Sequence, residues 1–116
     1  MLVVNRFVVA DEATFAERAA TALAALAARP GYLSGRIGRA ADAPDQWCLV
    51  TEWESVGAYR RALGAFEVKV HATPLLAECV DEPSAYEVLL AAAPGGPVTT
   101  ATSDRASQPP ALPSQA

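Results

Sequence analysis

The segment from Trp47 to His71 constrains the fold more than any other part of the chain, because an extended pattern runs directly into a helical one. Residues 47–53 alternate between two faces, as a half-buried strand does. One face carries Trp47, Leu49, Thr51 and Trp53. Ser55 has the side chain of a helix N-cap, and helical spacing follows it. A strand that leads into a helix is therefore expected here, in a segment that holds both tryptophans and the only histidine.

Three further strands and one long helix are predicted from the same kind of pattern. Strand patterns cover residues 2–9, 32–39 and 84–91, and a helix pattern with small alanine side chains begins after Asp11 and ends before Pro30 and Gly31. The order strand–helix–strand–strand–helix–strand predicts an α+β protein with a ferredoxin-like βαββαβ fold. In this fold a four-stranded antiparallel sheet carries its helices on one face.

The sheet face that the helices leave uncovered predicts a protein partner. The strands at 2–9, 47–53 and 84–91 carry apolar residues at odd and even positions, while the helices cover one face only. A monomer would expose a large apolar patch, which is rare among soluble monomers. We therefore expect a homodimer whose two sheets pack face to face.

The composition divides the chain at residue 92. Residues 1–91 have the patterns of one domain, whereas residues 92–116 are rich in Pro, Ser and Ala and contain almost no large apolar side chain. Such a segment buries too little surface to offset its chain entropy, so a disordered tail is expected.

Charge and hydropathy exclude several classes of function. The formal net charge is −4 and no Lys/Arg run is present, which argues against a nucleic-acid partner. No apolar run is long enough to cross a membrane. The start of the chain does not resemble a signal peptide, so a cytoplasmic location is expected. Cys48 and Cys79 lack metal-ligand spacing and are expected to be buried and reduced.

The phrase T-E-W-E-S-V-G-A-Y at residues 51–59 and the turn R-P-G-Y-L-S-G-R at residues 29–36, with the predicted element order, resemble the antibiotic biosynthesis monooxygenase (ABM) superfamily. The resemblance covers roughly residues 1–91. It implies a dimeric α+β barrel, in agreement with the free sheet face.

One branch of this superfamily oxidises polyketide-like phenols with O₂ and uses neither metal nor organic cofactor. The resemblance to this branch implies a small aromatic substrate, with Trp53 and Tyr59 at the substrate. The asparagine that the branch carries four residues before its tryptophan is Leu49 here.

A second branch binds and degrades heme. Asn5 stands where that branch has its strand-one asparagine, and His71 follows Trp53 by eighteen residues, the spacing of the heme ligand. The tryptophan that shapes the heme in that branch is Ala62 here. Heme is therefore the alternative to a site without cofactor.

Several residues remain as candidates for the site, each with an ordinary structural alternative. His71 and Asn5 are the candidate catalytic residues: His71 would be a base near neutral pH, and Asn5 is a polar side chain inside an apolar strand. The structural alternatives are that His71 is a solvated surface histidine and that Asn5 is a hydrogen-bonded amide of the core. The candidate substrate contacts are Trp53, Tyr59, Phe66 and Arg36. Aromatic side chains also fill cores, and arginines also solvate surfaces. A third possibility is a dimer that binds a small ligand without catalysis.

Overall fold

The computed structural model describes residues 1–101. The main sheet contains β1 (Leu2–Val8), β2 (Tyr32–Ala40), β3 (Ala43–Trp53) and β4 (Ala85–Tyr86). The helices are α1 (Glu12–Ala27), α2 (Val56–Leu63), α3 (Phe66–His71) and α4 (Thr73–Leu76). A short second sheet is formed by β5 (Leu90–Ala91) and β6 (Thr99–Thr100).

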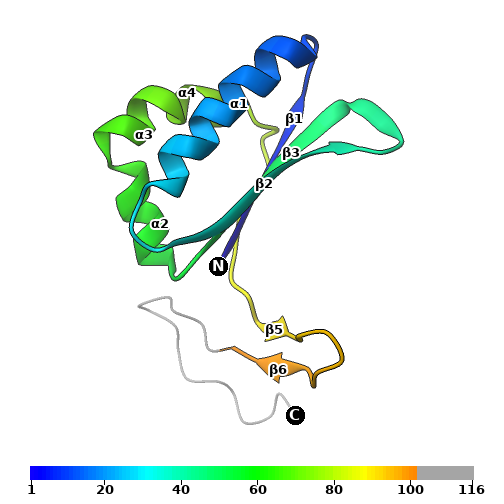
Figure 1. Ribbon diagram of the computed structural model, residues 1–116, viewed down its shortest axis with the longest axis vertical. Coiled ribbons are helices and arrows are strands. Elements are labelled where there is room, and N and C mark those ends of the chain that lie inside the picture. The colour runs from blue at the N-terminus through cyan, green and yellow to red at the C-terminus, as the bar shows by residue number, and fades with distance from the viewer. Residues whose placement is uncertain (102–116) are drawn as a thin grey trace.

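The main sheet has the ferredoxin-like strand order β2-β3-β1-β4, and its strand pairs are antiparallel. The four helices lie together on one side of the sheet, as Figure 1 shows. The α+β fold, the antiparallel four-stranded sheet and the one-sided helical layer expected from the sequence are confirmed.

Local capping explains where the first helix begins and ends. Asp11 accepts a hydrogen bond from the backbone N–H of Thr14 at 3.2 Å, which satisfies a free donor of the first turn of α1. After α1, Gly31 has φ +86°, a conformation that a side chain disfavours. A Cβ at this position would also lie 2.5 Å from the Cβ of Ala58, so the turn brings α2 close to the backbone.

The core lies between the sheet and the helices. Burial alternates along β1 and along the second half of β3: Val3 and Phe7 are buried under the helices with Leu49 and Trp53. The other sheet face carries apolar residues that no helix covers, including Val8, whose exposed fraction is 69%.

The structure differs from the sequence prediction in the fourth strand and after it. The predicted strand at 84–91 pairs with β1 at Ala85 and Tyr86 alone, because Tyr86 lies opposite Leu2 and β1 has no further residue to pair beyond its start. Leu90 and Ala91 instead pair with Thr99 and Thr100, which lie in the segment predicted to be disordered. The small β5–β6 hairpin lies apart from the helical layer (Figure 1). The rest of the predicted tail, residues 102–116, lies outside the described residues.

The second and third strands also extend further than predicted. Residues 43–46 lie between the predicted strands at 32–39 and 47–53, and their Asp and Pro content favours a loop. The structure instead begins β3 at Ala43, which pairs with Ala40. Gln46 pairs with Val8 on the other side, so both neighbouring strands support this extension. Within residues 1–101, no helix has the length and apolarity needed to cross a membrane.

Candidate functional site

Asn5 lies on β1, on the face of the sheet that packs against the helices, and its register partner is Leu49 on β3. Its exposed fraction is 6%, and its Nδ2 donates to the Sγ of Cys79 at 3.8 Å. Sulfur is a weak acceptor, so this buried amide has hydrogen-bonding capacity to spare. Asn5 also lines a pocket, and its amide is therefore available to a bound molecule.

We call this cavity the Asn5 pocket. Its volume is about 670 Å³, and it opens to solvent between α2, the α3–α4 segment and the chain before β4. Among the residues that the structure describes, its walls combine apolar side chains with short polar ones and one cation, Lys69. The lining residues are Asn5, Tyr59, Leu63, Lys69, Thr73, Leu76, Ala77, Cys79 and Ser84. A pocket of this size and character suits a small, largely apolar ligand held by a few polar contacts.

An aromatic cluster supports the pocket from behind. Trp53 is fully buried, and its Nε1 donates to Thr51 Oγ1 at 2.8 Å, so the indole N–H is already engaged within the protein. The Trp53 ring lies 5.5 Å from the ring of Tyr59 and 5.4 Å from that of Tyr32, measured between centroids. Trp53 thus positions Tyr59, and Tyr59 is the member of this pair that lines the pocket.

The Tyr59 hydroxyl is a neutral hydrogen-bonding group. Burial raises the pKa of Tyr59 above its ordinary value, and the charge that Cys79 can carry adds to this effect. Because the phenol stays protonated at neutral pH, it can donate to an anionic oxygen of a ligand. The Asn5 amide and the Tyr59 hydroxyl are thus two donors on one pocket.

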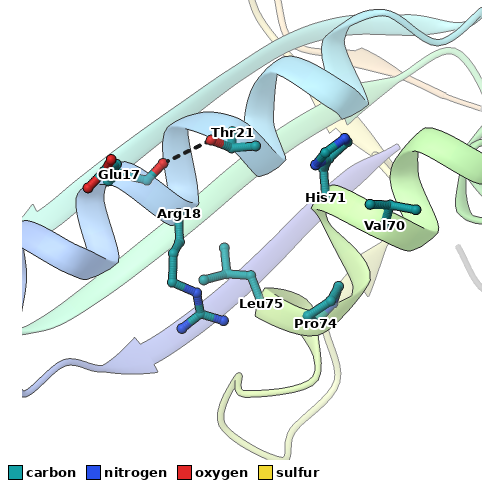
Figure 2. A pocket seen from close by; sticks show the side chains of 7 residues that line it. All are labelled: Glu17, Arg18, Thr21, Val70, His71, Pro74 and Leu75. Atoms are coloured by element: carbon teal, nitrogen blue, oxygen red, sulfur yellow. Dashed lines mark hydrogen bonds between the residues drawn. The ribbon is translucent and has the colours of Figure 1, made fainter.

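His71 lies elsewhere. Its side chain is 44% exposed, and its Nε2 lies 3.2 Å from Glu67 Oε2, one helical turn earlier on α3. It lines a separate depression of about 330 Å³ between α1 and the α3–α4 segment, beside Thr21 and Arg18 (Figure 2). In Figure 2, the Thr21 hydroxyl donates to the backbone carbonyl of Glu17, and the His71 ring points toward α1. The structure therefore does not bring His71 and Asn5 together on one cavity.

The remaining two candidates also lie outside the Asn5 pocket. Phe66 is the first residue of α3, and 74% of its surface is exposed. Arg36 on β2 pairs in register with Val50, on the sheet face opposite the helices. Of the six candidate residues, the structure places Asn5 and Tyr59 on the pocket and Trp53 directly behind it.

Several residues that line the pocket, Lys69 above all, are not singled out by the sequence patterns. A helical signal for them exists: Tyr59 and Leu63 are spaced i, i+4, as are Lys69 and Thr73, so each pair shares one side of its segment. Cys48 and Cys79 are predicted to be buried, but the structure leaves both partly exposed. The proximity of Cys79 to Asn5 follows from the tertiary fold alone.

The arrangement does not fit the heme site that the resemblance offered as an alternative. Such a site needs the strand-one asparagine and the histidine on the same cavity, whereas Asn5 and His71 line different ones. Ala62, at the position of the heme-shaping tryptophan, is 2% exposed and belongs to the core. Among residues 1–101, no three His, Cys, Asp or Glu side chains are grouped so that they could hold a metal ion.

Comparison with known proteins identifies the family. The antibiotic biosynthesis monooxygenase model matches residues 1–73, which is most of the described domain. The chain therefore belongs to the antibiotic biosynthesis monooxygenase family, as the resemblance implied.

Solved structures agree with this assignment. SnoaB, a cofactor-independent oxygenase from Streptomyces nogalater, is 30% identical, with a TM-score of 0.62 over 76% of this chain and 94% of SnoaB. A mutant of SnoaB gives 31% identity and a TM-score of 0.61 over 68% and 82%. A conserved protein from Methanosarcina mazei Go1, 20% identical with a TM-score of 0.59 over 72% and 84%, shares the fold. No curated protein sequence matches the chain.

Proposed function

We propose that this protein is a cofactor-independent monooxygenase that oxidises a small aromatic or polyketide-like molecule with O₂ in the Asn5 pocket. An anthrone-type substrate illustrates the reaction. Once ionised, the substrate gives an electron to O₂ and combines with the reduced oxygen. Its CH₂ group becomes a carbonyl that keeps one oxygen atom, and the other oxygen atom leaves as water.

The observation that carries this proposal is the pairing of the Asn5 amide and the neutral Tyr59 hydroxyl on one apolar pocket. Fixed donors that face a developing oxyanion stabilise it strongly where water is scarce. Family membership and the likeness to SnoaB, which is described as a cofactor-independent oxygenase, support the absence of a cofactor.

Oxygen uptake tests the proposal directly. The protein is incubated with a panel of anthrones and hydroquinones, without added metal or flavin, and O₂ consumption is compared with the spontaneous rate. We expect consumption above that rate for at least one substrate and formation of the matching quinone. Consumption at the spontaneous rate across the panel would overturn the proposal.

One observation favours a second candidate, a ligand-binding protein without catalysis. The quinone-forming branch carries an asparagine where this chain has Leu49, and Leu49 lies directly opposite Asn5 in the strand register. Leu49 is apolar and 2% exposed, so this chain lacks the amide that the branch carries at this position. Tight binding of a quinone with no O₂ uptake from the corresponding hydroquinone would support this candidate.

We also propose a homodimer formed through the uncovered sheet face. Leu2, Val4, Val8 and Val50 point to the face opposite the helices, and Arg6, the charged residue among them on β1, is bound by Glu82 at 2.7 and 2.6 Å. A face of this kind favours burial against a second copy. Light scattering at micromolar concentration should give twice the mass of the chain, and a stable monomer would contradict the proposal.

A cytoplasmic location fits the two cysteines. Cys48 and Cys79 are both free rather than joined in a disulfide. Free thiols persist in the reducing cytoplasm, so we propose this compartment for the protein. Fractionation of cells that express the full chain tests this location.

A further inference from the structure

Lys69 is the only lysine in the chain and, within residues 1–101, the only cationic side chain on the Asn5 pocket. It lies on α3 and is exposed, so it stands at the mouth of the pocket rather than in its interior. It forms no ion pair with any residue of the described range 1–101. Its ammonium group is therefore available to a ligand, although the chain as a whole has a net charge of −4.

The acidic residues nearby in the sequence are engaged elsewhere. Glu67 contacts His71 and lines a different depression. That depression is also lined by Ala24 of α1 and by Ala28, the C-cap of α1. Glu78 receives two hydrogen bonds from Arg18, and Glu82 receives two from Arg6. No carboxylate lines the pocket within the described residues, so nothing there neutralises Lys69.

The other titratable groups on the pocket are Tyr59 from α2 and Cys79 from the segment after α4. Burial raises the pKa of Tyr59, so this side chain serves as a donor and not as a base at neutral pH. No imidazole lines the pocket, because His71 faces the α1 side of α3. The described part of the chain thus offers the substrate a cation and neutral donors, but no carboxylate or histidine base.

We infer that the Asn5 pocket takes its aromatic substrate as an oxyanion, a phenolate or enolate, and that Lys69 selects this ionised form; the inference rests on the proposed function. The O–H bond of the substrate breaks and its proton passes to solvent water. The negative oxygen that remains is held by the Lys69 ammonium with the Asn5 and Tyr59 donors. A nearby cation lowers the pKa of an acidic group by stabilising its charged form, so the pocket can ionise the substrate without a base of its own.

A chromogenic phenol tests the inference without turnover. The probe is 4-nitrophenol, whose phenolate is yellow, and its matched neutral control is 4-nitroanisole. Absorbance titration of the bound probe against pH gives its pKa on the protein, and equilibrium dialysis gives the Kd of both compounds. We expect the wild-type protein to lower the probe pKa by about one unit, equivalent to about tenfold tighter binding of the phenolate than of the phenol.

The variants separate charge from shape. Lys69→Met keeps most of the aliphatic chain and removes the charge, so it should remove most of the pKa shift while 4-nitroanisole still binds as before. Lys69→Arg should keep most of the shift. Arg61→Gln removes an exposed cation from α2 that does not line the pocket, and it should behave as wild type. Circular dichroism checks that each variant is folded.

The outcomes distinguish this inference from the proposed function. An unchanged phenolate preference in Lys69→Met, or equal binding of both probes by the wild-type protein, overturns the role of Lys69 and leaves oxygen uptake as a separate question. If neither probe binds to the wild-type protein, the pocket is not an aromatic site, and both proposals fail.

Discussion

The amide Nδ2 of Asn5 donates to the Sγ of Cys79 at 3.8 Å, and this contact joins residues that are 74 positions apart in the chain. It attaches the first strand to the segment that follows α4, so the two together form one wall of the pocket. Sulfur is a weak acceptor, so the contact uses little of the hydrogen-bonding capacity of the Asn5 amide. The remaining capacity of this amide is directed to the cavity that Asn5 lines. Under the proposed function, the Asn5 amide therefore serves a bound ligand more than the stability of the fold.

Replacing Asn5 by leucine should separate these two roles. Asn5→Leu removes a donor from the pocket, and we expect kcat/KM for O₂ consumption to fall about 100-fold, the typical effect of losing one oxyanion donor. The melting temperature should stay the same or rise, because an apolar side chain of similar shape no longer buries an amide with a weak partner. Oxygen uptake and thermal unfolding measure the two effects.

The opposite pattern would contradict this assignment. If Asn5→Leu lowered the melting temperature by many degrees and left turnover intact, the Asn5 amide would be a structural group of the core. Cys79→Ala provides the matched control, since it removes the sulfur acceptor and leaves the Asn5 amide in place. Its turnover should stay close to that of the wild type.

Tyr59 should make the protein sensitive to alkaline pH. Its pKa is raised in the folded state, chiefly by burial, so the folded protein keeps a proton that the unfolded chain loses above a pH of about 10. Stability should therefore be unaffected below this pH and should decrease as the pH rises toward the raised pKa. Urea unfolding of wild-type protein and Tyr59→Phe at increasing pH measures the effect, and the variant should lose less stability. Parallel curves for the two proteins would contradict it.

Gly31 should be essential to the turn after α1. Gly31→Ala combines a positive φ with a Cβ placed 2.5 Å from the Cβ of Ala58, and we expect a loss of about 2–4 kcal/mol in unfolding free energy. Gly95→Ala is the matched control: its φ is +70°, but nothing lies within 4 Å of the added Cβ. It should cost no more than about 1–2 kcal/mol, the penalty for the left-handed backbone alone. Equal losses in the two variants would show that the contact with Ala58 does not matter.

The sequence predicts the fold well where a local signal and burial agree. Alternation over residues 47–53, the Asp11 cap and the Gly31 turn each correspond to what the structure shows. The strand predicted at residues 84–91 is too long, because an alternating pattern does not indicate where the neighbouring strand β1 ends. In the structure, β4 ends at Tyr86, which pairs with Leu2, the first residue of β1.

The candidate site was predictable in part, for a physical reason. Asn5 stands out as a polar residue in an apolar strand, and Tyr59 belongs to a recognisable phrase. His71 stands out only by its spacing from Trp53, and spacing along the chain does not say which side of a short helix faces the sheet. Lys69 lies two residues earlier, on the side of α3 that lines the pocket.

Hemin titration should show no specific heme complex. The residues that would have to hold the porphyrin, Asn5 and His71, line separate cavities. We expect no shift of the Soret band that depends on His71, and no heme degradation under a reductant. A stoichiometric heme complex that is lost in His71→Ala would contradict this expectation and would restore the heme-degrading branch as the closer functional relative.

Replacing His71 should leave oxygenation almost unchanged if the Asn5 pocket is the reaction site. The side chain is 44% exposed, contacts Glu67 at 3.2 Å and faces the depression beside α1, so His71→Gln removes nothing from the pocket. We expect turnover within about twofold of the wild-type rate, the usual range for an exposed substitution, and an unchanged melting temperature. A fall of 100-fold with the fold intact would mean that His71 is the catalytic base after all, and that the substrate binds between α1 and α3 instead of beside Asn5.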